Sequence, residues 1–297
     1  MRRVLILLFS MILPFTGCKK QGSGISSHIQ FSIGGDLSYV NQILDMGGVY
    51  RDSGKPADPY LIFSSYGANT IRFRLFHNPE WTAGVYEPPL DHFYNDIEDT
   101  RRGILAAKAN GMAVCLDFHY SDTWADPQKQ IKPSAWDNLT PEVLADSLYN
   151  YTYQTLRKLD ASGAMPEYVQ VGNEINPGFL LPTGDRWKNT TVFAGLLNSA
   201  IRGVRDASVQ SATKPKIILH VAQPENAIRW FQGLDSYGIT DYDIVGLSYY
   251  YIWSTVKIDL LSDYIEAVRK NTGRDVMIVE TAYPWTTLNG DSYGNII

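Results

Sequence analysis

Short apolar, β-branched runs alternate with longer amphipathic stretches, and this alternation restricts the chain to few folds. We predict strands at 31–33, 70–76, 112–118, 168–172, 216–221, 244–249 and 276–280. Helical patterns lie between them, at 40–46, 94–110, 141–161, 190–208, 224–236 and 257–271. Buried strands that alternate with helices form a parallel sheet covered by helices. Two architectures meet this description, the closed (β/α)8 barrel and the open doubly wound sheet.

The polar residues that follow the predicted strands favour the barrel. An open sheet usually carries a glycine-rich phosphate loop after its first strand, and Gly34-Gly35-Asp36 is only a fragment of one. Strand after strand ends instead in a polar group that can take part in chemistry. Active sites of (β/α)8 barrels are assembled from the C-terminal ends of several strands. We therefore predict an α/β fold, the (β/α)8 or TIM barrel.

Two glutamates end two of these strands and are the strongest candidates for catalysis. Glu174 follows 168–172 directly after Asn173, and Glu280 ends 276–280. These are the fourth and seventh predicted strands, whose ends can face each other across the mouth of a barrel. Cleavage of a glycosidic bond needs such a pair, with one carboxyl protonated and the other ionised. We therefore predict a glycoside hydrolase.

The neighbours of the two glutamates indicate which carboxyl carries the proton. Glu174 lies beside the amide of Asn173, which suits a carboxyl with a raised pKa. Arg72 and the hydroxyl of Tyr249 can keep Glu280 ionised. A carboxyl separation of about 5–5.5 Å gives retention at the anomeric carbon, and about 6.5–9.5 Å gives inversion. The pattern of residues leaves that choice open.

Composition indicates the class of partner. Aromatic residues make up 12% of the chain, with 7 Trp and 19 Tyr. They either fill core and surface or supply flat rings that stack on the apolar faces of sugars. The net charge of −5 provides no basic surface for nucleic acid. We therefore expect a polysaccharide as partner, and the chemistry needs no cofactor.

Motifs around the glutamates give the chain a resemblance to glycoside hydrolase family 53. Asn173-Glu174 with Glu280 is similar to the catalytic residues of retaining (β/α)8 glycosidases. More specific matches occur in the expected order at 34–38, 67–74, 116–127, 170–174, 243–250 and 280–285. The resemblance implies a retaining arabinogalactan endo-β-1,4-galactanase, which cleaves β-1,4-galactosidic bonds in the (arabino)galactan side chains of pectin.

The resemblance also implies roles for individual residues. Glu174 would be the general acid/base and Glu280 the nucleophile, with Asn173 on the 2-hydroxyl of the sugar. Arg72 and Tyr249 would orient Glu280. Further substrate contacts would come from polar side chains and flat rings, namely Asp36, His119, Asp122, Trp124 and Trp285. His119 can instead be a buried strand-end histidine, and either Trp can be a core residue.

The first residues predict export. Arg2 and Arg3 precede an apolar run at 4–13 that is too short to span a bilayer, as in a secretory signal. Thr16-Gly17-Cys18 resembles a bacterial lipobox, in which Cys18 carries the lipid. We expect a signal peptide at 1–17, a lipid-anchored tether at 18–28 and a catalytic barrel domain at 29–297. The protein would lie at the bacterial cell envelope, at the outer membrane or cell surface, and touch the membrane only through this lipid.

The C-terminal residues add two expectations. Oxygen-bearing residues alternate in the run Asn289, Asp291, Tyr293 and Asn295, a spacing that can wrap a structural Ca²⁺. A polar turn is the other explanation of this run. The chain ends soon after the seventh predicted strand, so we expect the eighth strand and its helices to be missing from this chain. Two strand edges would then be unpaired.

Two other functions remain open from the sequence alone. The same mechanism would serve on another β-linked polysaccharide, such as a mannan or a glucan. A non-catalytic, glycan-binding lipoprotein at the surface would account for the aromatic residues and the anchor. It would not account for two strand-end glutamates, one of them beside Asn173.

Overall fold

One parallel sheet of seven strands forms the centre of the fold. The computed structural model describes residues 31–283, 286 and 288. Neighbouring strands pair in the order β1-β4-β5-β6-β9-β10-β11. Their bounds are β1 (Gly34–Asp36), β4 (Thr70–Leu75), β5 (Ala113–Phe118), β6 (Tyr168–Val171), β9 (Lys216–Ala222), β10 (Ile244–Ser248) and β11 (Asp275–Glu280). Within the described residues, β1 and β11 are the two edges of the sheet.

Helices and short hairpins fill the connections. The α-helices are α1 (Val40–Asp45), α2 (Pro59–Ser65), α3 (Trp81–Gly84), α4 (Ile97–Ala109), α5 (Pro141–Ala161), α6 (Thr190–Ser208), α7 (Pro224–Phe231) and α8 (Leu261–Thr272). The 3₁₀ turns are η1 (Ser134–Trp136), η2 (Asp235–Tyr237) and η3 (Ile258–Leu260). The hairpins pair β2 (Arg51–Asp52) with β3 (Lys55–Pro56), and β7 (Gly178–Phe179) with β8 (Gly184–Asp185). In this part of the chain no helix combines the length and the apolarity that crossing a bilayer requires.

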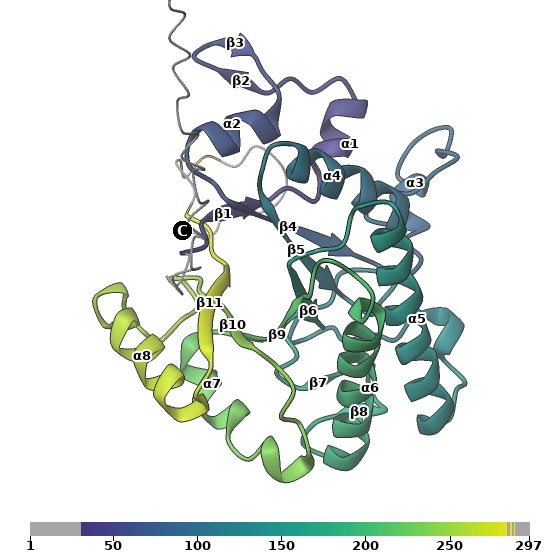
Figure 1. The fold of residues 1–297 in the computed structure, drawn as a ribbon, viewed down its shortest axis with the longest axis vertical. Coiled ribbons are helices and arrows are strands. Elements are labelled where there is room, and N and C mark those ends of the chain that lie inside the picture. The colour runs from purple at the N-terminus through teal and green to yellow at the C-terminus, as the bar shows by residue number, and fades with distance from the viewer. Residues whose placement is uncertain (1–30, 284–285, 287, 289–297) are drawn as a thin grey trace, which may run out of the picture. The chain divides into compact units, whose positions relative to one another are not determined.

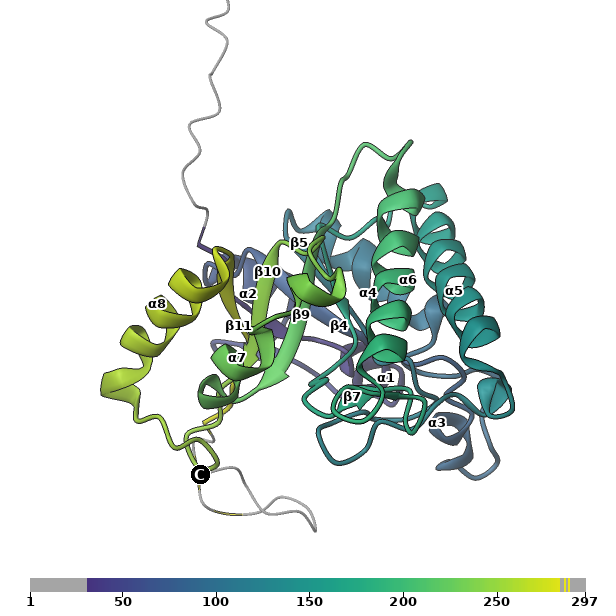
Figure 2. The ribbon, with the colours of Figure 1, turned by 90° about the horizontal axis from the view of Figure 1, so that it is seen from below.

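The strand order confirms the predicted barrel architecture. A doubly wound sheet reverses its strand order at a switch point, whereas this order follows the chain from β1 to β11. The sheet curls, and helices pack on its outer side (Figure 1). Two of them, α5 and α6, lie side by side along it (Figure 2). The described residues thus contain seven strands of a (β/α)8 barrel.

Side-chain alternation divides each strand between two environments. Successive side chains of a strand point to opposite faces. Ile71, Phe73 and Leu75 of β4 are buried in the core that the helices share with the sheet. Arg72, between them, faces the inside of the curl, as do Asp117 and its inward neighbours on the other strands. The apolar core therefore lies outside the curled sheet, and a buried polar cluster lies inside it.

The first strand lies further along the chain than predicted, at Gly34–Asp36 instead of 31–33. Ile33 is 54% exposed, so the apolar residues that suggested the strand are not part of the core there. A Cβ at Gly34 would lie 1.6 Å from the carbonyl oxygen of Thr70. Close pairing of β1 with β4 therefore requires glycine, a residue that weakens the hydrophobic signal of a strand.

Two helical glycines provide a matched test of the packing between helices and sheet. A Cβ at Gly103 of α4 would lie 2.5 Å from the ring of Phe73, whereas a Cβ at Gly195 of α6 would meet nothing within 4 Å. Alanine favours a helix by about 1 kcal/mol over glycine, and overpacking costs about 1–3 kcal/mol. We expect Gly195→Ala to raise the free energy of unfolding by up to about 1 kcal/mol, and Gly103→Ala to lower it by up to about 2 kcal/mol. Urea unfolding measures both, and shifts of the same sign would contradict this packing.

Candidate active site

A buried arginine, Arg72, lies at the centre of the inward-facing polar cluster. Its side chain is 5% exposed, and its Nη1 lies 2.9 Å from Asp36 Oδ2. Its Nη2 lies 2.7 Å from Asp117 Oδ2 and 2.8 Å from Glu280 Oε1. The same nitrogen donates a hydrogen bond to Asn173 Oδ1 at 2.9 Å. One guanidinium therefore joins four elements of the sheet, and the surrounding carboxylates compensate its buried charge.

Asp117 provides a permanent negative charge beside this arginine. Burial opposes its ionisation, but Arg72 and then His119 outweigh burial and lower the pKa of Asp117 to about 2. Gln170 Nε2 donates a hydrogen bond to Asp117 Oδ1 at 2.5 Å. Because it is ionised and completely buried, Asp117 fixes the position of Arg72 as its counter-ion.

Glu280 is turned toward the cluster by an irregularity in β11. Leu247 of β10 pairs with Ile278, but Ser248 pairs with Glu280, so Val279 is an extra residue in the ladder. A bulge of this kind redirects the side chains that follow it. In a regular strand Glu280 would face the same way as Ile278, which packs against the helix-side core. The bulge therefore places the carboxylate inside the curl.

The surroundings of Glu280 favour its ionised form. Burial raises the pKa of this carboxyl, but Arg72 outweighs burial and holds the pKa below its usual range. The hydroxyl of Tyr250 donates a hydrogen bond to Glu280 Oε2 at 3.0 Å. Burial, followed by the charge of Glu280, raises the pKa of Tyr250, which keeps that hydroxyl protonated. Glu280 is therefore an anion whose two oxygens are both held.

Glu174 has the opposite preference. It is 8% exposed, and burial, followed by the charge of Glu280, raises its pKa to about 7. The hydroxyl of Ser248 donates a hydrogen bond to Glu174 Oε1 at 2.5 Å. Ser248 is also the partner of Glu280 in the ladder, so both glutamates are neighbours of this one residue. A carboxyl that holds its proton lies next to a carboxylate that does not.

His220 of β9 supports Glu174 and was not predicted from the sequence. Its Nδ1 accepts a hydrogen bond from the backbone N–H of Glu174 at 3.3 Å, and its Nε2 lies 2.9 Å from Ser248 Oγ. Burial lowers the pKa of His220 to about 4, so the ring is neutral at pH 7. Its Nδ1 also lies 3.0 Å from Asn173 Oδ1, so the ring contacts the residues on both sides of the acid. The only sequence signal was a histidine at an inward position of an apolar strand.

The prediction that Tyr249 orients Glu280 is wrong. The hydroxyl of Tyr249 donates to the carbonyl oxygen of Val256 at 3.1 Å, and the residue is buried away from the carboxylate. Its neighbour Tyr250 makes the contact instead. Because side chains alternate along extended backbone, Tyr250 faces the same side as Ser248 and Tyr249 faces the other.

Two predicted sugar ligands hold the protein's own loops, and their contacts with sugar stay predictions. His119 is 1% exposed, its Nδ1 accepts from the N–H of Ala125 at 3.0 Å, and its Nε2 lies 2.9 Å from Asp117 Oδ2. Asp122 Oδ2 accepts from the backbone N–H of Ser134 at 2.8 Å and from its hydroxyl at 2.9 Å. Both side chains therefore position loops, since their polar atoms are engaged with the protein.

Asp36 and Asn173 lie in the cluster, and their contacts with sugar stay predictions. Asp36 Oδ2 lies 2.9 Å from Arg72 and 3.1 Å from Arg74. Asn173 is completely buried, and its Nδ2 donates to the carbonyl oxygen of Ala125 at 2.8 Å. These contacts fix both side chains close to the two glutamates.

An open cleft of about 720 Å³ lies over Glu174 and Glu280. Trp124 lines it, with the guanidinium carbon of Arg74 4.4 Å from the centre of its ring. Trp253 lines it as well and is 57% exposed. Trp253 was not predicted from the sequence, because it belongs to no strand-end motif. One half-buried and one exposed flat ring beside a carboxyl pair fit the stacking of a sugar chain.

Several predicted residues lie outside the described part of the chain. They are Cys18, Trp285 and the proposed calcium run Asn289, Asp291, Tyr293 and Asn295. Within residues 31–283, 286 and 288, no three His, Cys, Asp or Glu side chains are grouped to hold a metal ion. Calcium binding by the C-terminal run stays a prediction, which calorimetry on chelator-treated protein can test.

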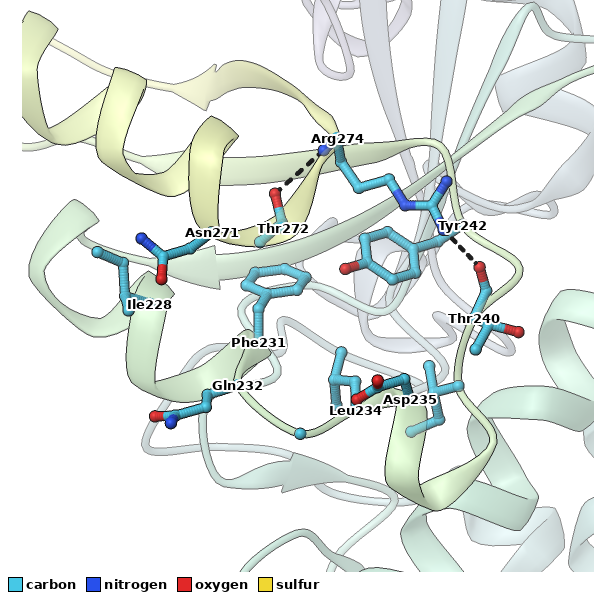
Figure 3. Close-up of a pocket in the computed structure, with 12 residues that line it drawn as sticks. Ile228, Phe231, Gln232, Leu234, Asp235, Thr240, Tyr242, Asn271, Thr272 and Arg274 are labelled. Carbon is cyan, nitrogen blue, oxygen red and sulfur yellow. Dashed lines mark hydrogen bonds between the residues drawn. The ribbon is translucent and has the colours of Figure 1, made fainter.

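A separate hollow of about 370 Å³ lies between α7 and α8 (Figure 3). Arg274 donates to the carbonyl oxygen of Thr240 at 2.8 Å, and its guanidinium lies 4.9 Å from the centre of the Tyr242 ring. Tyr242 lies two residues before β10 and Arg274 directly precedes β11, so the hollow lies at the N-terminal ends of these strands. That end of a barrel serves stability rather than catalysis.

Known proteins are similar to this chain in sequence and in fold. Residues 32–297 match the family model of Glycosyl hydrolase family 53. The chain is 42% identical over 282 residues to the arabinogalactan endo-beta-1,4-galactanase of Cellvibrio japonicus, a match that covers 93% of this chain and 72% of that protein. It is 35% identical over 271 residues to the endo-beta-1,4-galactanase of Bacillus subtilis, covering 89% of this chain and 59% of that protein. The solved Ignisphaera aggregans GH53 catalytic domain matches with a TM-score of 0.81 at 34% identity, over 96% of this chain and 75% of that one.

The different protonation states of the two carboxyls can be tested by titration. Wild-type Glu174 should be protonated below about pH 7 and ionised above it. Glu280→Gln removes the neighbouring negative charge, so the pKa of Glu174 should fall. Ser248→Ala removes a hydrogen bond that lowers this pKa, so the pKa should rise. Carbon-13 NMR of labelled glutamate side chains measures these values, and an unchanged Glu174 titration in both variants would refute the coupling.

Proposed function

Since the chain belongs to glycosyl hydrolase family 53, we propose that it hydrolyses β-1,4-galactosidic bonds inside (arabino)galactan chains, with retention at the anomeric carbon. The observation that carries this proposal is the pair of carboxyls of opposite protonation, Glu174 and Glu280, at one open cleft. An open cleft accommodates the middle of a polymer, which fits an endo-acting enzyme. Relatives named arabinogalactan endo-beta-1,4-galactanase support the choice of substrate.

In the first step the Glu280 carboxylate attacks the anomeric carbon, and the bond from that carbon to the glycosidic oxygen breaks. Glu174 donates its proton to the leaving oxygen, so one fragment of the galactan leaves as a neutral alcohol. Arg72 and Tyr250 hold the two oxygens of Glu280 and orient the attack. The product of this step is a glycosyl ester of Glu280.

In the second step Glu174 acts as the base. Ester formation removes the negative charge of Glu280, and that charge is the second cause of the raised pKa of Glu174. The pKa of Glu174 therefore falls, which keeps its carboxylate ionised until a water molecule enters. Glu174 takes a proton from that water as the oxygen attacks the anomeric carbon, and Glu280 leaves as a carboxylate.

The buried charges favour an enzyme over a protein that only binds glycan. Recognition of a neutral sugar chain requires hydrogen bonds and flat rings, which Trp124 and Trp253 can supply. It does not require Arg72 to be buried among three carboxylates, because burying charged groups is costly. Catalysis does require an oriented anion at the anomeric carbon.

Substitution of the two glutamates tests the assignment. Glu280→Ala should lower the turnover of linear β-1,4-galactan by about 10³-fold or more, because the nucleophile is lost. With an activated aryl β-galactoside, azide should restore turnover to this variant and give the α-galactosyl azide. Azide with Glu174→Ala should instead give the β-galactosyl azide, because the nucleophile is still present. Glu142→Ala, on the first turn of α5, is the control.

Product analysis distinguishes the possible results of this experiment. Release of oligosaccharides from galactan but not from mannan or glucan supports the proposed substrate. Release from mannan or glucan alone would change the substrate and leave the mechanism. Wild-type turnover in Glu280→Ala would overturn the assignment of the nucleophile.

We also propose that the protein is exported and held at the cell envelope by a lipid on Cys18. The support is the basic start, the short apolar run at 4–13 and the lipobox-like Thr16-Gly17-Cys18. A lipid anchor would keep the enzyme where polymers too large to enter the cell are available. Cys18→Ala should move the protein from the membrane fraction to the soluble fraction after cell lysis. An unchanged distribution would contradict the anchor.

A further inference from the structure

A groove of about 390 Å³ continues the catalytic cleft on one side. Pro127, Asn176 and Asn226 line both the cleft and the groove, so the two form one continuous depression. Trp187 and Arg229 line only the groove, whereas Glu174 and Glu280 line the cleft and not the groove. The groove therefore leads away from both glutamates.

Trp187 is an exposed ring that the protein nevertheless holds in place. It is 54% exposed, in the segment between β8 and α6. Its indole N–H donates to the carbonyl oxygen of Asn176 at 3.1 Å, and its backbone N–H donates to Asp185 Oδ1 at 2.9 Å. A ring that is already fixed loses little conformational entropy when a ligand stacks on it.

Two arginines lie next to this ring, one buried and one exposed. The guanidinium carbon of Arg186 lies 5.1 Å from the ring centre, and that of Arg229 lies 5.4 Å from it. Arg186 is 4% exposed and also packs over the ring of Trp230 at 4.4 Å, so it supports Trp187 from the protein side. Arg229 is exposed at the rim, as is Asn226. The groove thus combines a flat apolar ring with polar donors that can reach the hydroxyls of a sugar.

The position of the acid determines which part of a substrate would occupy the groove. Asn176 is two positions beyond Glu174 in the chain, and its carbonyl oxygen holds the indole of Trp187. Glu174 protonates the leaving oxygen, so the leaving part of the chain extends past Glu174 and away from Glu280. We propose that Trp187, with Asn226 and Arg229, binds the leaving-group portion of a β-1,4-galactan chain beyond the point of cleavage. This inference rests on the function proposed above.

The experiment compares long and short substrates. Trp187→Ala should lower kcat/KM on linear β-1,4-galactan by about 3- to 10-fold, the loss expected for one aromatic stacking contact. Hydrolysis of 4-nitrophenyl β-1,4-galactobioside should stay at the wild-type rate, because its single aryl leaving group does not reach the groove. Trp187→Phe keeps a flat ring without the indole N–H and should retain most of the activity on galactan.

Trp81 provides a matched control. It is 45% exposed, its indole N–H also donates to a backbone carbonyl, that of Asp122, and it lines neither the cleft nor the groove. Trp81→Ala should leave the hydrolysis of both substrates at the wild-type rate. The proposed role of Trp187 is refuted if Trp187→Ala and Trp81→Ala have the same kcat/KM on galactan. It is also refuted if Trp187→Ala lowers kcat/KM equally on galactan and on the galactobioside.

A binding measurement separates this inference from the proposed function. In a Glu280→Gln background, mobility in a native gel that contains galactan reports binding without turnover. Addition of Trp187→Ala should weaken the retardation, and addition of Trp81→Ala should not. A wild-type chain that releases nothing from galactan would overturn the proposed function. Equal retardation of Glu280→Gln/Trp187→Ala and Glu280→Gln/Trp81→Ala would instead overturn the proposed binding of galactan by Trp187.

Discussion

The buried charge of Arg72 is the constraint on which the rest of the site depends. Three carboxylates, from Asp36, Asp117 and Glu280, lie within 3 Å of its guanidinium nitrogens. They come from β1, β5 and β11, at the two edges and in the interior of the sheet. An unpaired charge at this depth would be strongly destabilising, so the strands must be in register for the arginine to be tolerated. Fold and site are therefore coupled through one side chain.

The same arginine makes two glutamates chemically different. Glu280 contacts it directly and stays ionised although burial opposes this. Glu174 is held by the neutral hydroxyl of Ser248 instead, and burial with the nearby charge of Glu280 raises its pKa to about 7. Two identical side chains at similar depth thus have opposite protonation states, because only one of them contacts the cation.

The sequence predicted what depends on pattern and missed what depends on local geometry. Alternating strands and helices predicted the barrel, and acids at strand ends predicted Glu174 and Glu280. Adjacent tyrosines gave no means of choosing between Tyr249 and Tyr250, since the choice depends on which one faces inward. The bulge at Val279 was equally invisible, although it turns Glu280 into the site.

Other residues were missed because their signal is spatial. His220 lies in an apolar strand and acquires a role only through Ser248, a residue of the neighbouring strand. Trp187 and Trp253 lie in loops, where no periodicity indicates which way a ring faces. His119 and Asp122 were placed in the right region, but their loop contacts could not be read from a linear motif.

The turn after β6 connects the acid with the groove beyond it. Gly172 and Glu174 both have positive φ, at 81° and 46°, and this conformation is unfavourable for a glutamate. A Cβ at Gly172 would lie 2.6 Å from the side chain of Ile175, so the tight turn requires glycine there. The turn directs Glu174 toward Ser248 and brings Asn176 under Trp187. One strained turn therefore positions both the proton donor, Glu174, and the ring of Trp187. That ring is proposed to bind the fragment of galactan that receives the proton, so the same turn serves both proton transfer and the binding of a long substrate.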